Sequence, residues 1–167
     1  MLKNGLLYCL FIWSLAGCKI NYSTQGGPID PNLKTISIDQ FSNQASLGPS
    51  TIGFTFTEKL RDLFQSQTKL NLISLNGDLN YEGTISSYTI QPISVQGDQT
   101  AAQNRLTISV KVNFQNKLEE KKNFEQSFTR FADYSSSSDI NSIQDRLIEE
   151  IFDQITQDIF DKTLGDW

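Results

Sequence analysis

Residues 105–115, RLTISVKVNFQ, alternate between polar and apolar side chains without interruption. The apolar parity consists of Leu106, Ile108, Val110, Val112 and Phe114. Successive side chains of a β-strand point to opposite faces, so this stretch predicts a long strand with one buried and one hydrated face. A strand of this kind is typical of an antiparallel sheet that is covered on one side only. The rest of the chain must therefore supply the cover.

Several other stretches predict strands that could pair with this one. They are residues 35–39, 70–75, a long stretch from 79 toward Pro92, and 124–134. In the long stretch the parity of the apolar residues changes between Ile85 and Tyr88, which predicts a β-bulge near Ser86 and Ser87. Pro92 lacks an N–H, so it predicts the end of central pairing or a sheet edge. Asn76-Gly77-Asp78 predicts a turn between two strands.

Two amphipathic stretches predict the helices that cover the sheet. Residues 52–67 carry an apolar stripe at helical spacing after a capping Ser50 or Thr51. A longer helix follows the four serines at 135–138, with Ser138 or Asp139 as its cap. The expected order is β-α-β-β-β-β-α. The fold class is α+β, with a mainly antiparallel sheet of four to five strands and two helices packed on one face.

The N-terminus carries a targeting segment. Lys3 precedes an apolar run over 6–13, which is too short to span a bilayer as a helix. The run closes on Leu15-Ala16-Gly17-Cys18, which resembles the bacterial lipobox. That resemblance implies a signal peptide over 1–17, cleavage before Cys18, and lipid on the thiol and α-amine of Cys18. The alternative is an ordinary secretory signal in which the cysteine is accidental.

The remaining chain divides into two parts. Residues 18–33 contain Gly26-Gly27-Pro28 and Pro31, a composition that favours a lipidated tether. Residues 34–167 are long enough for a single α+β domain with its own core. A lipid anchor with two or more chains holds a protein stably at a membrane, so such a tether would leave the domain free to stand off the surface.

Composition argues against most catalytic chemistry. The chain has no histidine, and its two cysteines are Cys9 in the signal and Cys18 at the lipidation site. Nucleophilic systems that depend on histidine or on a mature thiol are therefore excluded. The carboxylates of Asp78 with Glu82, and of Glu119 with Glu120, read as solvated turn charges. We find no motif for a catalytic site, a metal or a cofactor, and the net charge of −5 argues against nucleic acid as a partner.

Binding chemistry is better represented. The hydrated parity of the long strand includes Lys111, with Arg105 at its start, and Arg130 follows on the returning strand. These three cations are candidates for contact with lipid phosphates or with a partner protein. The alternative is an ordinary solvated sheet face. The C-terminal Trp167 either packs against the helix end or touches a partner.

Read in order, the motifs of the whole chain resemble one known family. They are the lipobox, TEKLRDLF (57–64), GDLNYEGTISSYTIQP (77–92), NRLTISVKVNFQN (104–116), FEQSFTRFADY (124–134), and a final helix containing RLIEEIF (146–152) with a terminal Trp. Together they are similar to the lipopolysaccharide-assembly lipoproteins of the LptE family, in its Bacteroidetes branch. The family's fold, a sheet of about four strands with two helices on one side, matches the pattern above.

The resemblance implies a function and a location. LptE-like proteins are lipid-anchored at the outer membrane, face the periplasm, plug the large β-barrel LptD and assist delivery of lipopolysaccharide (LPS) to the cell surface. It implies an LptD-like barrel as partner, LPS as a further ligand, and no enzymatic activity. Basic residues on the family's sheet contact LPS phosphates, for which Arg105, Lys111 and Arg130 are the candidates here. The alternative function is a generic periplasm-facing envelope lipoprotein that binds another lipid, glycan or secretion component.

Overall fold

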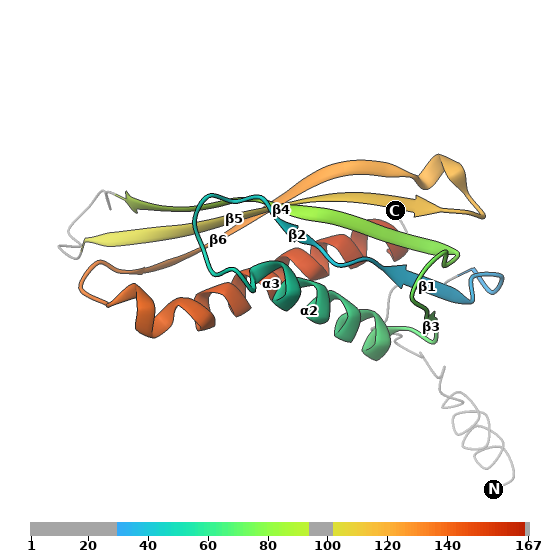
Figure 1. Cartoon of the computed structure of the whole chain (residues 1–167), viewed down its shortest axis with the longest axis horizontal. Helices are drawn as coiled ribbons and strands as arrows, with labels where there is room; N and C mark the ends of the chain where they lie inside the picture. The colour runs from blue at the N-terminus through green and yellow to red at the C-terminus, as the bar shows by residue number, and fades with distance from the viewer. Residues whose placement is uncertain (1–29, 94–101, 166–167) are drawn as a thin grey trace, which may run out of the picture.

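The computed structural model describes residues 30–93 and 102–165. Its elements, in chain order, are β1 (Thr35–Ile38), β2 (Ser42–Asn43), α2 (Ile52–Gln67), β3 (Asn71–Leu72), β4 (Leu79–Ile93), β5 (Gln103–Asn116), the short 3₁₀ helix η2 (Glu120–Lys122), β6 (Phe124–Ser135) and α3 (Ile140–Leu164). The predicted signal peptide over 1–17 and residues 18–29 of the predicted tether lie outside the described residues. Figure 1 shows an elongated molecule in which one twisted sheet runs the full length.

The sheet is mixed, so the prediction of a mainly antiparallel sheet of four to five strands is wrong. Its order is β3-β1-β4-β5-β6, with β2 also paired to β4, which makes six strands. β4, β5 and β6 are antiparallel to one another, whereas β1 is parallel to both β3 and β4, and β2 is parallel to β4. The physical reason is the α2 crossover, because a chain that returns through a helix re-enters the sheet in its original direction.

The Asn-Gly-Asp turn connects β3 and β4 without making a hairpin. β1 lies between those two strands, so residues 73–78 must cross β1 to reach its other side. Asn76 takes the left-handed conformation with φ of 62°. A Cβ atom on Gly77 would lie 2.5 Å from the backbone nitrogen of Ser37, so only glycine allows this close approach. The sequence located the turn and the two strands that it connects, but not the insertion of β1 between them.

Most other predicted elements are confirmed. The first helix spans Ile52–Gln67 as expected, with Thr51 at its N-cap, although the Thr51 side chain makes no cap hydrogen bond. Asp139 caps the last helix by accepting from the backbone N–H of Asn141. The register of β4 against β5 shifts between Ile85 and Ser87, where the parity change predicted a bulge. Leu33, assigned to the end of the tether, is buried against the domain.

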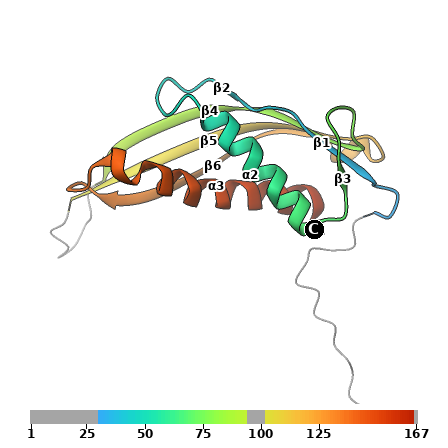
Figure 2. The same cartoon turned by 60° about the horizontal axis from the view of Figure 1, so that its bottom comes forward.

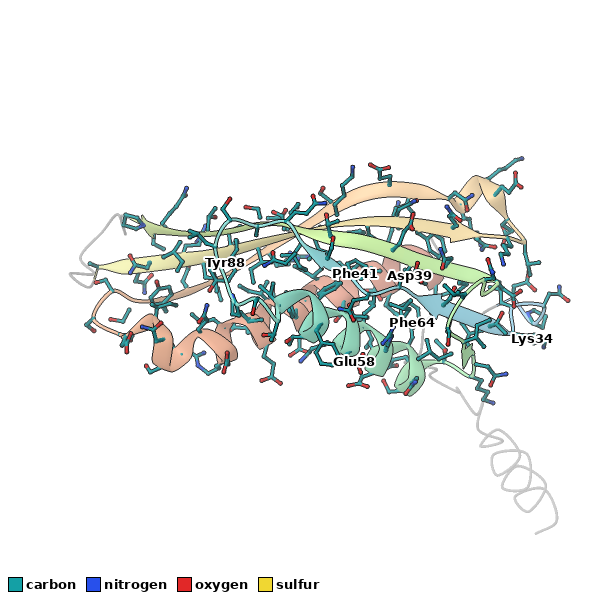
Figure 3. The ribbon with its side chains drawn as sticks, in the orientation of Figure 1. Lys34, Asp39, Phe41, Glu58, Phe64 and Tyr88 are labelled. Carbon is teal, nitrogen blue, oxygen red and sulfur yellow. The ribbon has the colours of Figure 1, made fainter. Side chains whose placement is uncertain are left out.

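Both helices cover the same face of the sheet, as predicted. Figure 2 shows α2 and α3 side by side beneath the strands. The apolar parity of β5 points toward them and is fully buried. Two runs of ring contacts bind the layers: one is Phe41–Phe56–Phe152, and the other is Phe64–Tyr81–Phe114–Phe124, with centroid separations of 4.9–5.2 Å. Figure 3 labels Phe41 and Phe64, which lie between strands and helix.

Candidate functional site

The face of the sheet that points away from the helices is polar along most of its length. On β5 it carries the predicted hydrated parity: Arg105, Thr107, Ser109, Lys111 and Asn113. In the ladder, Ser109 lies opposite Ser87 of β4 and Thr129 of β6, and its Oγ is 2.8 Å from the Thr129 Oγ1. The half-exposed ring of Phe131 interrupts this surface. We call it the open face; its hydroxyl and amide groups can exchange hydrogen bonds with water or with a polar partner.

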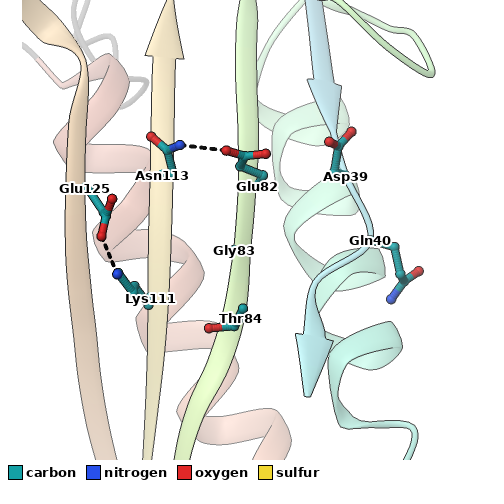
Figure 4. Close-up of a pocket in the computed structure, with 8 residues that line it drawn as sticks. All are labelled: Asp39, Gln40, Glu82, Gly83, Thr84, Lys111, Asn113 and Glu125. Atoms are coloured by element: carbon teal, nitrogen blue, oxygen red, sulfur yellow. Dashed lines mark hydrogen bonds and ion pairs between the residues drawn. The ribbon is translucent and has the colours of Figure 1, made fainter. Parts of the chain in front are cut away.

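A shallow depression of about 420 Å³ lies on the open face where β4 and β5 meet the residues after β1. Figure 4 shows its lining, with the Lys111 ammonium paired to the Glu125 carboxylate and Asn113 Nδ2 donating to Glu82 Oε1 at 2.6 Å. Asp39 adds a third carboxylate, and the remaining lining residues are Gln40, Gly83 and Thr84. Three carboxylates against one lysine make the depression acidic, which disfavours a phosphate ligand.

Arg105 lies on the open face as predicted, and it is held by two neighbours. Its Nε and Nη2 donate to the two carboxylate oxygens of Asp133 at 2.7 and 2.9 Å. Its guanidinium also stacks 3.6 Å above the centre of the Phe131 ring. The hydrogen bonds from Arg105 hold the pKa of Asp133 below its usual range, and the bonds to Asp133 raise the pKa of Arg105. This is a planar, bidentate pair that fixes the side chain in place.

Arg130, which the sequence groups with Arg105 and Lys111 as a candidate contact, does not lie on the open face. The register opposes Arg130 to Ile108, one of the helix-facing residues of β5. Arg130 donates from Nε and Nη2 to the two carboxylate oxygens of Asp158 on α3, at 2.6 and 2.7 Å. These bonds raise the pKa of Arg130. The reason is strand parity: Arg130 is two residues from Phe128, and both face the helix layer.

The structure therefore does not gather the three predicted cations into a basic patch. Arg105 and Lys111 are six residues apart on one strand, about 20 Å along the open face, and Arg130 is on the other face. Each is paired with a carboxylate from a neighbouring element: Asp133, Glu125 and Asp158 respectively. The partner carboxylates could not be assigned from the sequence, because pairing them requires the register of β5 with β6 and the docking position of α3.

A second feature, which the sequence analysis missed, lies at one end of the sheet. The Asp78 carboxylate accepts the backbone N–H groups of Lys34 and Thr35, each at 2.9 Å, and these bonds lower the pKa of Asp78. The backbone carbonyl of Asp78 accepts from the N–H of Lys117, and the Lys117 ammonium donates to the carbonyl of Asn76. Asp78 thus joins the start of β1, the β3–β4 connection and the β5–β6 hairpin. A polar turn residue gave no signal of this role.

Neither of these surfaces has the features of a metal-binding site or of a membrane-spanning helix. Across residues 30–93 and 102–165, no group of three or more acidic, histidine or cysteine side chains could hold a metal ion. Over the same residues, no helix is both long and apolar enough to cross a membrane.

Comparison with known proteins identifies the family to which this fold belongs. The family model of LptE, described as lipopolysaccharide-assembly, matches residues 33–163, nearly the whole described domain. The chain belongs to the LptE family. The match starts where the structure shows the first buried residue, Leu33, and ends near the last turn of α3. The resemblance inferred from the ordered motifs is therefore confirmed, and the protein is an envelope lipoprotein of LPS assembly.

A comparison with solved structures finds similar chains at low sequence identity. An uncharacterized lipoprotein B from Nitrosomonas europaea is 12% identical, with a TM-score of 0.52 over 86% of this chain and 87% of that one. A minor lipoprotein from Acinetobacter baumannii is 16% identical, with a TM-score of 0.49 over 76% and 89% of the two chains. No curated protein matches the sequence at a significant level. At such identities the likeness concerns the fold alone.

Proposed function

We propose that this LptE-family lipoprotein is the subunit of the LPS translocon that plugs and supports an LptD-like barrel in the outer membrane during LPS delivery to the cell surface. The observation that carries the proposal is the family match across residues 33–163. The protein is anchored through lipid on Cys18 and faces the periplasm, and its role is binding and support without catalysis. The lipobox at 15–18 supports the anchor.

The open face supports the plug role on physical grounds. The lumen of a large barrel is polar and wet, so a plug needs a surface that hydrogen-bonds without an extensive apolar interface. The open face offers hydroxyl and amide groups on the three long antiparallel strands β4, β5 and β6, which pair along β5 with one register shift between Ile85 and Ser87. The apolar side chains of β5 are buried against the helices. The sheet can therefore present the open face to a partner without exposing its core.

The ion pairs of Arg105, Lys111 and Arg130 favour a role in barrel support over a role in LPS binding. An LPS phosphate that approached Arg105, Lys111 or Arg130 would have to displace Asp133, Glu125 or Asp158. Two of these pairs are bidentate, and such pairs are the stronger kind of charged hydrogen bond. These three cations therefore remain candidate contacts that depend on exchange of partners, whereas the uncharged hydroxyl and amide groups of the open face need no such exchange.

The decisive experiment is co-purification. An affinity-tagged chain is isolated from detergent-solubilised outer membranes, and we expect it to retrieve a β-barrel protein of LptD size. Recovery of a monodisperse monomer with no barrel would contradict the proposal. Depletion of the protein should also lower surface LPS; unchanged LPS would favour the generic envelope lipoprotein.

The contact surface can be tested with matched double variants. Ser109→Arg with Thr129→Arg places two bulky charges at the centre of the open face, and we expect it to reduce the amount of barrel recovered. Ser66→Arg with Gln154→Arg is the control, since both residues are exposed on the helix layer. Equal recovery of the barrel with both double variants would show that the open face is not the contact.

A further inference from the structure

The end of the sheet around Asp78 exposes more aliphatic surface than a solvated turn requires. We call it the hairpin end; it consists of residues 30–35, 69–78 and 117–123. Leu75 is 66% exposed, Leu118 is 48% exposed and Ile73 is 37% exposed. Leu75 directly precedes Asn76, whose carbonyl accepts from the Lys117 ammonium at 2.6 Å, and Leu118 directly follows Lys117. The two leucines therefore come from loops that touch each other.

Exposed lysines outnumber carboxylates at the hairpin end by five to four, and the carboxylates are Asp30, Asp78, Glu119 and Glu120. Lys34, Lys69, Lys117, Lys121 and Lys122 all belong to the hairpin end. Lys122 pairs with Glu119, while Lys34, Lys69 and Lys121 make no ion pair with any residue in the described ranges 30–93 and 102–165. Exposed aliphatic groups on the same end of the sheet as lysines without a carboxylate partner match the interface of an anionic bilayer, where the apolar groups enter the headgroup layer and the ammonium groups meet phosphate.

The direction of the chain points to the same surface. Residues 19–29 lead from Cys18 to Asp30, a stretch that reaches at most about 40 Å when extended. Asp30 begins a turn closed by the N–H of Leu33, and the chain then passes Lys34 and enters β1 at Thr35. Figure 3 shows Lys34 at one end of the sheet and Tyr88 toward the other. A lipid on Cys18 would therefore place the membrane within about 40 Å of the hairpin end, where the chain enters the domain.

We propose that the hairpin end docks on the surface of an anionic phospholipid bilayer, with Leu75 and Leu118 entering the headgroup layer. The inference rests on the lipid anchor of the proposed function but goes beyond it. The anchor alone holds the protein at the membrane and leaves its orientation free. Docking through the hairpin end stands the strands upright on the bilayer, so that the open face of the subunit is accessible before a barrel is engaged.

The first measurement determines how deeply the hairpin end enters the membrane. Cys18 is the one cysteine of the chain after residue 9, so the chain from Cys18 onward can be coupled through this thiol to a maleimide lipid. Trp167 is replaced by Phe, and a single reporter is introduced as Leu118→Trp or, as control, Leu47→Trp. The vesicles contain phosphatidylethanolamine and phosphatidylglycerol, with brominated acyl chains as quencher. We expect several-fold stronger quenching and a blue-shifted emission at position 118 compared with position 47.

Leu47 is a matched control because it is equally apolar and exposed but distant. A side chain on its neighbour Gly48 would lie 2.9 Å from the Tyr88 ring. Tyr88 is ten residues beyond Asp78 on β4, about 30 Å along the strand. Equal quenching at positions 118 and 47 would overturn the proposal.

The second measurement separates the apolar contribution to membrane binding from the electrostatic one, on a chain that carries no lipid anchor. The chain from residue 18 onward with Cys18→Ser is floated with the same vesicles. We expect Leu75→Ser with Leu118→Ser to lower the partition coefficient about tenfold, and Leu47→Ser with Phe54→Ser to leave it unchanged. Lys34→Glu with Lys121→Glu should lower it about tenfold on vesicles with phosphatidylglycerol and have little effect on vesicles of phosphatidylcholine alone.

Each outcome bears on one claim only. If the hairpin-end leucine variant, confirmed as folded by circular dichroism, partitions like the parent chain, the docking proposal fails. No barrel is present in either measurement, and the lipid is attached chemically. Failure here therefore leaves the translocon proposal standing, and loss of the barrel in co-purification leaves the docking result intact.

Discussion

The two faces of the sheet differ in how their side chains are used. On the covered face, apolar residues of β4, β5 and β6 pack against both helices, and Phe56 of α2 contacts Phe41 and Phe152 at ring separations of 4.9 and 5.0 Å. On the open face, side chains meet one another in short pairs such as Ser109 with Thr129 and Glu82 with Asn113. The first is a continuous core, and the second is a series of separate polar contacts.

The difference shows where stability and recognition reside. Burial of apolar surface is the dominant favourable contribution to folding, and the covered face carries nearly all of it. Hydrogen bonds exposed to water contribute little net free energy, because water replaces them when they break. The open face can therefore be shaped for a partner at little cost to the fold. Three substitutions test this division, in order of decreasing expected effect.

Phe56→Ala should produce the largest loss. Phe56 is 0% exposed and lies between two other rings, so its removal leaves a cavity between α2 and the sheet. We expect a decrease of about 3–5 kcal/mol in the free energy of unfolding, measured by urea denaturation. Phe54→Ala is the control, because Phe54 is 59% exposed on the same helix, and it should change stability by less than about 0.5 kcal/mol.

Asp78→Ala should have an intermediate effect, although Asp78 shares the parity of the open face. It leaves the N–H groups of Lys34 and Thr35 without their carboxylate acceptor, at a cost of about 1–2 kcal/mol. The pKa of Asp78 is lowered by these bonds. Its contribution is therefore complete above the unfolded pKa of about 4 and is lost as the pH falls through the lower folded value.

The pH dependence provides the control for Asp78. Asp78→Asn keeps a neutral oxygen acceptor but has no proton to gain. Urea midpoints measured between neutral and acidic pH should fall more steeply for the parent chain than for this variant at the acidic end. Parallel curves would show that the Asp78 charge does not stabilise the start of β1.

Ser109→Ala with Thr129→Ala should have the smallest effect. It removes both partners of one hydrogen bond on the open face, and such paired removal is nearly neutral. We expect a change within about 0.5 kcal/mol in urea unfolding. A loss as large as that of Phe56→Ala would break the division between the two faces.

Parity and periodicity explain which predictions succeeded. The alternation over 105–115 identified both faces of β5, and the parity change at Ser86 and Ser87 identified the bulge, because strand geometry imposes a period of two at every residue. The stripes over 52–67 and from Ile140 onward identified both helices for the equivalent reason. Arg130 was grouped with Arg105 and Lys111 by charge, although it shares the parity of Phe128 and faces the helix layer.

The amino-acid sequence by itself determined the elements, the apolar side of each, the N-terminal motif that suggests an anchor, and the family. These are encoded locally or in the order of motifs, so they can be read without a partner strand. Tertiary structure alone decided that β1 inserts between β3 and β4, that the three predicted cations are each paired with a carboxylate, and that the loops carrying Leu75 and Leu118 touch beside Asp78. These depend on which distant segments pair, and that choice is made by the packing of the whole domain.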